Sequence, residues 1–183
     1  MIILTNDREP LIRTVFFSRR LIPHNDVLLV SPYLTLELFR KTGLLGKLLD
    51  DLCSDGSQVT LITSLPSRSD LPILEDLGSR GIALYFYPDV HSKLYIFSVD
   101  RTRLRTPDEY RSIAIVGSAN LTDSGLKLRN SGNEEIAIEV SDKNVQALRT
   151  IALGLKTRSI DLIKLRMLYA ATKSDRLGKG DLR

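Results

Sequence analysis

The chain has 183 residues, of which 26 are Lys or Arg and 22 are Asp or Glu, and its formal net charge is +4. Hydrophobic residues at 43% and charged residues at 26% are near globular averages, which excludes a chain that is disordered throughout. The length fits one domain, and a single cysteine excludes an internal disulfide or a four-cysteine zinc site. No apolar run is long enough to span a bilayer, and the first residues lack the pattern of a secretory signal. We therefore expect a cytoplasmic protein with no membrane partner.

Predicted strands and helices alternate along the first half of the chain. The strands are expected where short runs are rich in apolar and β-branched residues, at 26–33, 58–63, 82–87, 92–98, 112–117 and 134–140. Helices are predicted over 35–53 and 69–79, and each is followed by a glycine that favours its end. After Asp142 the apolar spacing becomes helical.

This order of elements predicts an α/β fold. Strands that alternate with helices need crossover connections, and nearly continuous apolar strands are covered on both faces. We therefore expect a mixed, largely parallel sheet flanked by helices on both faces. The chain is expected to form a single domain over 1–183, with 142–172 as a helical C-terminal extension and 173–183 as a flexible tail.

Three short motifs follow one another in the second half of the chain. They are HSK at 91–93, GSANLT at 117–122 and NEE at 133–135. Side chains two residues apart on a strand point the same way, so His91 and Lys93 are expected to project together. Ser118 and Asn120 are expected to do the same beyond the next strand, and Glu135 begins a third. Strand ends of an α/β sheet are common ligand sites.

These residue types fit the chemistry of a phosphodiester. A neutral imidazole such as that of His91 can attack phosphorus, and Lys93 can supply positive charge to a phosphate oxygen. Ser118 and Asn120 supply hydrogen-bond donors, and a carboxylate such as Glu135 can fix the tautomer of a histidine. The sequence shows no zinc-ligand spacing, Walker loop or dinucleotide fingerprint. The motifs therefore predict a phosphodiesterase site that needs no metal or cofactor.

The ordered motifs resemble the signature of the phospholipase D superfamily, in which HxK, GSxN and a glutamate follow one another. The resemblance covers about residues 27–140 and is closest to the nuclease-like branch with a single motif copy, similar to the catalytic domains of metal-independent restriction endonucleases. The family usually has Asp after four further residues beyond the lysine, where this chain has Ser98. Branches without this Asp act on nucleic acids, so the difference favours a nucleic-acid substrate over a lipid.

The resemblance implies a phosphohistidine mechanism in which two histidines face one phosphate. The second histidine of this chain, His24, lies outside any motif, so the two half-sites must come from two chains. We expect a C2 homodimer with the active site at its interface. The catalytic residues of each chain are then expected to be His91, Lys93, Ser118, Asn120 and Glu135. Two purely structural alternatives stay open: Ser118 could cap the turn that follows it, and Glu135 could be an ordinary charged residue on an edge strand.

The resemblance also implies a hydrolase that binds nucleic acid, with DNA favoured over RNA. The predicted backbone contacts are Arg101, Arg103, Arg105 and Arg111. A solvated surface hairpin is the alternative for this segment. Because no base-reading module is evident, an endonuclease of a restriction or defence system would need a separate recognition domain or subunit.

Two other functions stay open. The first is a non-catalytic module that binds phosphate or nucleic acid and dimerises, which the serine at position 98 favours. The second is a phospholipase, although the sequence shows no amphipathic membrane-binding helix with a strongly basic face.

Overall fold

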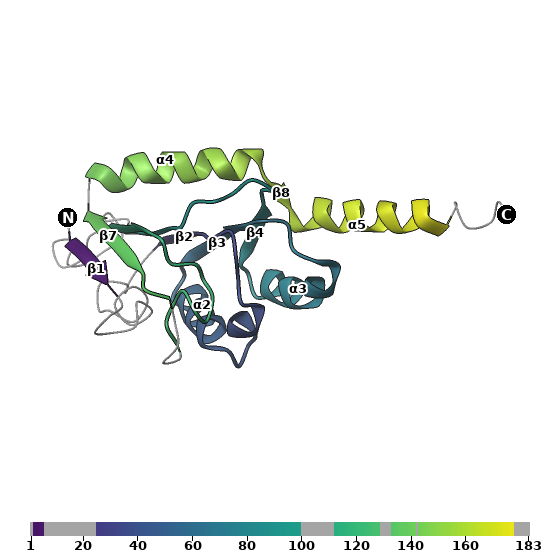
Figure 1. The fold of residues 1–183 in the computed structure, drawn as a ribbon, viewed down its shortest axis with the longest axis horizontal. Coiled ribbons are helices and arrows are strands. Elements are labelled where there is room, and N and C mark those ends of the chain that lie inside the picture. Colours follow the sequence, from purple (N-terminus) through teal and green to yellow (C-terminus); the bar gives the residue numbers. More distant parts are fainter. Residues whose placement is uncertain (1, 6–24, 100–111, 129–132, 142, 178–183) are drawn as a thin grey trace.

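A sheet of eight strands lies at the centre of the structure, a computed structural model that describes residues 2–5, 25–99, 112–128, 133–141 and 143–177, with side chains up to residue 172 (Figure 1). The strands are β1 (Ile2–Thr5), β2 (Asp26–Val30), β3 (Gln58–Thr63), β4 (Ala83–Phe86), β5 (Leu94–Ser98), β6 (Ile113–Gly117), β7 (Ile136–Ser141) and β8 (Ile160–Asp161). The helices are α2 (Leu44–Ser54), α3 (Leu71–Ser79), α4 (Lys143–Arg158) and α5 (Leu162–Leu177), with short 3₁₀ turns η2 (Leu36–Phe39) and η3 (Arg68–Asp70).

The sheet is mixed, as predicted, but it is mostly antiparallel, so the prediction of a largely parallel sheet is wrong. Its strands lie in the order β1-β7-β6-β5-β2-β3-β4-β8. Among the eight described strands, the β2–β3 and β3–β4 pairs are the parallel ones, because α2 and α3 supply the crossovers that parallel pairing requires. Strand β5 pairs antiparallel with β2, β6 pairs antiparallel with β5, and β7 pairs antiparallel with β6.

Helices cover both faces of the sheet, which confirms the predicted layers (Figure 1). Leu29 of β2 packs in one core together with Leu49 of α2 and Leu77 of α3. The next residue back, Leu28, points to the other face and packs in a second core with Val145 of α4. Both cores follow from alternation of side chains along strands that are largely apolar on both faces.

Some element boundaries differ from the predicted ones. The range 35–53 divides into η2 and α2, because a turn at Gly43 brings the two against each other. A Cβ on Gly43 would lie 2.4 Å from the Leu38 carbonyl oxygen, so only glycine fits this turn. The strands β1 and β8 were not expected. Helix α5 continues to Leu177, past residue 173 where a flexible tail was predicted to begin.

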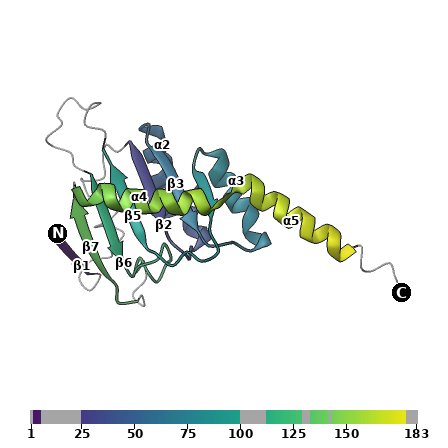
Figure 2. The same cartoon turned by 90° about the horizontal axis from the view of Figure 1, so that it is seen from above.

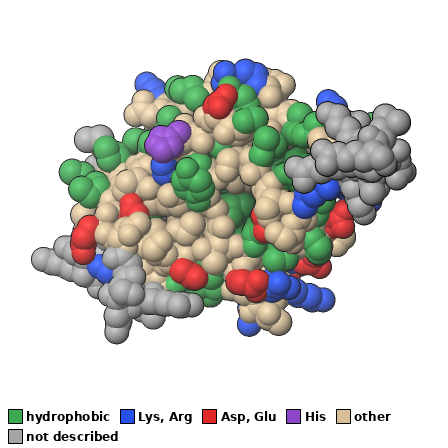
Figure 3. All heavy atoms as spheres, turned by 45° about the vertical axis from the view of Figure 1, so that its right-hand side comes forward, with side chains coloured by type: hydrophobic (Ala, Val, Ile, Leu, Met, Phe, Trp, Pro, Cys, Tyr) green, Lys and Arg blue, Asp and Glu red, His purple; other side chains and the backbone are tan. Residues whose placement is uncertain are grey.

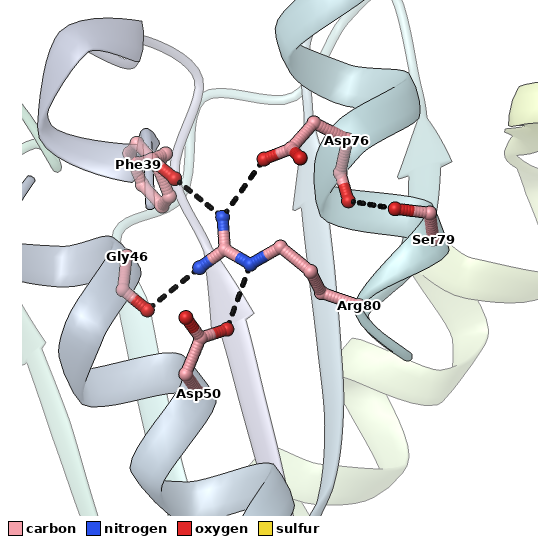
Figure 4. Close-up of polar contacts among 6 residues, drawn as sticks. All are labelled: Phe39, Gly46, Asp50, Asp76, Ser79 and Arg80. Carbon is pink, nitrogen blue, oxygen red and sulfur yellow. Dashed lines mark hydrogen bonds and ion pairs between the residues drawn. The ribbon is translucent and has the colours of Figure 1, made fainter. Parts of the chain in front are cut away.

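Arg80, at the end of α3, joins three elements on one face of the sheet (Figure 4). Its Nε donates to Asp50 Oδ1 of α2 at 2.7 Å, and Nη2 donates to the Gly46 carbonyl at 2.7 Å. Its Nη1 donates to the Phe39 carbonyl of η2 at 3.0 Å and to Asp76 Oδ2 at 3.1 Å. Burial would lower the pKa of Arg80, but the bonds to Asp50 and Asp76 raise it. The guanidinium therefore stays charged and ties α2, α3 and η2 together.

Helix α5 extends away from the body of the molecule beyond its first turns (Figures 1 and 2). Its Leu165 is buried in the core that also holds α2 and α3. Further along, the Tyr169 hydroxyl donates to the Pro66 carbonyl, and the Arg68 guanidinium lies 5.5 Å from the centre of the Tyr169 ring. Helix α5 thereby holds the loop between β3 and α3. Among the described helices, none combines the length and apolar character needed to cross a membrane.

Candidate functional site

The predicted site residues lie along one edge of the sheet, here called the site edge. The cross-strand pairs Val30–Leu94, Leu94–Val116 and Val116–Ile138 align the carboxyl ends of β2 and β6 with the amino ends of β5 and β7. The residues that fall on this edge, just outside the strands, are His91, Lys93, Ser118, Asn120 and Glu135. Three motifs that are separate in the sequence therefore meet at one place.

Ser118 and Glu135 are in direct contact. The Ser118 hydroxyl donates to the Glu135 carboxylate and accepts a hydrogen bond of 3.2 Å from the backbone N–H of Ile136. Glu135 is 6% exposed, so its carboxylate is held largely away from water. Glu135 is therefore more than a solvated edge charge, and Ser118 is oriented by β7.

Lys93 lies beside the first residue of the GSAN motif. The Gly117 N–H donates to the Lys93 carbonyl at 3.2 Å, so these residues face each other between β5 and β6. A Cβ on Gly117 would lie 2.6 Å from the Ile136 carbonyl oxygen, which explains why the motif begins with glycine. The Lys93 ammonium group donates to the His91 carbonyl at 3.0 Å, and the His91 side chain is exposed. Figure 3 shows a histidine on the surface next to a cationic side chain.

Asn120 carries an unpaired polar atom at the site edge. Within the part of the chain that the structure describes, its Oδ1 atom is buried and has no hydrogen-bond partner. Buried polar atoms are nearly always bonded in folded proteins, so this oxygen, which can only accept, is an exception, and any contact with a phosphate oxygen would come from the amide N–H instead.

Ser98 lies far from these groups. It pairs with Asp26 at the opposite end of β5, about 13 Å from Leu94 at the usual strand rise. Ser98 is therefore not one of the groups gathered at the site edge.

Two buried residues that were not predicted from the sequence, Tyr95 and Ser31, lie beneath the GSAN motif. The Tyr95 hydroxyl donates to the Ala119 carbonyl at 2.6 Å, and the Ser31 hydroxyl accepts from the Leu121 N–H at 3.0 Å. Both bonds fix the loop that carries Ser118 and Asn120. Tyr95 stands two residues after Lys93, and no sequence motif marked it or Ser31 as a support of this loop.

Replacing Tyr95 with phenylalanine is expected to lower the free energy of unfolding by about 1–2 kcal/mol at pH 7, because the buried Ala119 carbonyl loses its donor. Burial raises the pKa of Tyr95, the hydrogen bond with Ser31 lowers it, and the Glu135 carboxylate raises it. The stability that depends on the neutral hydroxyl is therefore present below the ordinary tyrosine pKa of about 10 and is lost as the pH rises above it. Urea titrations of both proteins from pH 7 to pH 11 should show their difference shrink above pH 10, and a constant difference would contradict this.

Some predicted residues cannot be placed. The four arginines expected to contact nucleic acid, Arg101, Arg103, Arg105 and Arg111, lie outside the described residues, as does His24. Over the ranges that are described, no group of three or more His, Cys, Asp or Glu side chains is arranged to hold a metal ion.

A mixed sheet between helices, with HxK, GSxN and glutamate residues on one edge, defines a phospholipase D-like protein. A family model described as "Cardiolipin synthase, PLD-like domain" matches residues 23–152. The chain therefore belongs to this family of PLD-like domains, in a superfamily whose members cleave or transfer phosphodiesters. A comparison with curated protein sequences finds no match.

Solved structures share the fold at low sequence identity. Nuc from Salmonella typhimurium, a phospholipase D family member, is 15% identical with a TM-score of 0.62, over 87% of this chain and 97% of Nuc. Polyphosphate kinase from Porphyromonas gingivalis is 12% identical with a TM-score of 0.61, over 84% of this chain and 25% of the kinase. Phosphatidylserine synthase from Haemophilus influenzae Rd KW20 is 15% identical with a TM-score of 0.53, over 97% of this chain and 46% of the synthase. These similarities confirm the phospholipase D fold.

Proposed function

We propose that the chain is an endonuclease that hydrolyses phosphodiester bonds of nucleic acid through a phosphohistidine on His91. The observation that carries this proposal is the meeting of three motifs at the site edge, where the Ser118 hydroxyl contacts Glu135 and Lys93 faces Gly117. The Lys93 ammonium and the Asn120 amide N–H would bind the non-bridging phosphate oxygens, because each can donate a hydrogen bond, and the Ser118 hydroxyl would join them by turning its single proton from Glu135 to the phosphate. Glu135 would orient Ser118.

The reaction would proceed in two displacements at phosphorus. A ring nitrogen of His91 attacks, a P–N bond forms, and the P–O bond to the leaving oxygen breaks. His91 of the partner subunit, in its protonated form, gives its proton to that oxygen. The same imidazole then takes a proton from water, whose oxygen attacks phosphorus and releases His91. The two steps together consume the phosphodiester and one water molecule, and they return both imidazoles to their starting protonation states without a metal ion.

The need for a second imidazole is the reason to propose a C2 homodimer. His24 belongs to no motif, so the acid that protonates the leaving oxygen is best supplied by His91 of the partner subunit. Two copies of the site edge would then face each other across the two-fold axis.

An exposed apolar patch beside the site edge supports this arrangement. Ile3, Ile138 and Val116 are cross-strand neighbours and point to one face of the sheet. Ile136 lies two residues before Ile138 and points the same way, and the exposed fractions of the four side chains range from 38% to 67%. Val140, two residues further along β7, instead packs against the core under α4. An exposed apolar patch beside the site edge is the kind of surface that two copies of the chain would bury against each other in a dimer.

Mixed dimers test whether the site is shared. Wild-type chains and His91→Ala chains are unfolded together, refolded at equal amounts and assayed. If each site needs both copies of His91, activity should fall to about one quarter of the wild-type value, because only a quarter of random dimers hold two intact chains. If each chain acts alone, activity should fall to about one half.

Sedimentation provides the control for this experiment. The wild-type chain should sediment as a dimer, and Ile138→Asp should shift it toward the monomer with a matching loss of activity. Ile151→Asp, an exposed change on α4, should leave the dimer intact. A strictly monomeric chain that retains full activity would rule out the shared site.

The choice of substrate is tested by offering plasmid DNA, single-stranded DNA, RNA and phosphatidylcholine to the full chain in EDTA. Cleavage of nucleic acid is expected, with DNA cut faster than RNA, because the proposed reaction needs no metal. Activity that returns only with a divalent metal would contradict the mechanism. Hydrolysis of phosphatidylcholine alone would indicate a phospholipase, and binding of DNA without cleavage would indicate a non-catalytic module. A cytoplasmic role in restriction or defence, with a separate recognition subunit, stays a prediction.

A further inference from the structure

A cavity of about 480 Å³ opens beside the site edge, at the carboxyl ends of β2 and β3. Its walls come from η2, from the start of α3 and from the loop between β3 and η3. The motifs HSK, GSANLT and NEE contribute no residue to it. Tyr33, which follows β2 and is 59% exposed, forms part of its lining.

The cavity lies close enough to the site to hold part of the same substrate. Strand β2 pairs with β5, and Val30 is opposite Leu94, so the cavity begins one strand away from Lys93. Strand β3 is the second strand from β5, with β2 between them, and neighbouring strands lie about 4.8 Å apart. A phosphate at His91 and a group in the cavity would therefore be about 10 Å apart.

The charges in the cavity do not favour a phosphate. Arg40 forms a two-point ion pair with Glu37, in which Nη2 donates to Oε1 at 2.9 Å, so its charge is already balanced. Asp70 accepts from the Ser67 N–H at 2.8 Å and from the Ser67 hydroxyl at 2.7 Å. The lining contains one cationic side chain and two carboxylates, and much of the rest is hydroxyl or apolar. Such a surface suits an uncharged group with hydrogen-bond donors.

The geometry points to a nucleoside subsite: we propose that the cavity holds the base and sugar next to the scissile phosphate, with the base stacked on Tyr33. This inference rests on the proposed nuclease function and names the part of its substrate that the cavity recognises. Stacking on an exposed aromatic ring accepts every base, which suits cleavage without a fixed sequence. A cavity of about 480 Å³ also fits a group of nucleoside size better than a choline or ethanolamine headgroup, which would leave most of it empty.

The walls of the cavity are fixed in advance. Arg80 ties η2 to α2 and α3 through the Phe39 carbonyl, Asp50 and Asp76. The loop on the other side is held by α5, where the Tyr169 hydroxyl donates to the Pro66 carbonyl. Because the cavity is formed before the ligand arrives, binding costs little conformational entropy. Most ligand sites are preformed in the same way.

Binding is measured first, because it does not depend on activity. Thymidine 5′-monophosphate, inorganic phosphate and phosphocholine are titrated into the full chain by calorimetry. The nucleotide should bind about tenfold more tightly than phosphate, and Tyr33→Ala should remove this difference whereas Tyr33→Phe keeps it. Ile151→Ala, at a side chain that is also 59% exposed, is the matched control and should change nothing. Equal affinity for nucleotide and phosphate, or tighter binding of phosphocholine, would overturn the nucleoside subsite.

Kinetics separate this inference from the proposed function. Two diesters with the same leaving group are compared in EDTA, thymidine 5′-(p-nitrophenyl phosphate) and methyl p-nitrophenyl phosphate. Tyr33→Ala should lower kcat/KM about tenfold for the nucleoside diester and leave the methyl diester unchanged. An equal effect on both diesters overturns the subsite but leaves the nuclease intact. If neither diester is hydrolysed by the wild-type chain, the proposed function fails, and the binding titration alone decides on the subsite.

Discussion

Replacing His91 with alanine is expected to lower phosphodiester cleavage by roughly 10⁴-fold or more, to the background of the assay. The reason is that the imidazole is the proposed nucleophile, and a methyl group offers no lone pair to phosphorus. The His91 side chain is exposed, so its loss should leave the fold intact. The measurement is the initial rate on the best nucleic-acid substrate in EDTA, together with the thermal unfolding midpoint of each protein.

The neighbouring residue provides the control for this experiment. Ser92 is also exposed and lies between His91 and Lys93, but it has no role in the proposed reaction, so Ser92→Ala should retain activity. Rapid quenching of wild-type protein with labelled substrate should trap a phosphoryl group that is stable in base and labile in acid, and His91→Ala should trap none. Full activity in His91→Ala, or label on another residue, would contradict the mechanism.

Replacing Arg80 with alanine is expected to have the largest effect on stability, about 3 kcal/mol of unfolding free energy. The Arg80 side chain is 12% exposed, and its loss leaves Asp50 and the Phe39 and Gly46 carbonyls without their donor. Arg80→Lys should recover only part of the loss, because one ammonium group cannot reproduce the planar fork of the guanidinium. Urea unfolding followed by circular dichroism measures both changes.

Arg40 is the matched control for Arg80. It also forms an ion pair, with Glu37, but the two side chains are 53% and 67% exposed, and water screens their attraction. Arg40→Ala should therefore leave the unfolding midpoint nearly unchanged. Equal effects of the two substitutions would show that the bonds of Arg80 do not hold α2, α3 and η2 together.

Most of the strands, and a set of candidate site residues, were predictable from the sequence. His91, Lys93, Ser118, Asn120 and Glu135 were identified from motif order and strand alternation, and the structure gathers all of them on one edge. This worked because alternation and strand ends are local properties that a short stretch of chain encodes. The layers were predictable for the same reason, since strands such as β2 are apolar on both faces.

Strand direction could not be read in the same way. A strand such as β5 has the same residues whether it pairs parallel or antiparallel, and only its place beside β2 decides. The alternation of helices and strands in the first half correctly predicted two parallel pairs but was extended too far along the sheet.

Other features exist only in the tertiary structure, because they join residues that are distant in sequence. Ser98 belongs to the motif in the sequence but lies at the far end of β5, and the bond from the Tyr95 hydroxyl to the Ala119 carbonyl joins residues 24 positions apart. The cavity at Tyr33 is assembled from two strand ends and two helical segments, and no single segment encodes it. Short-range patterns thus determined which residues are candidates for the chemistry, and long-range packing decided which neighbours support them, because contacts between distant segments form only when the sheet closes.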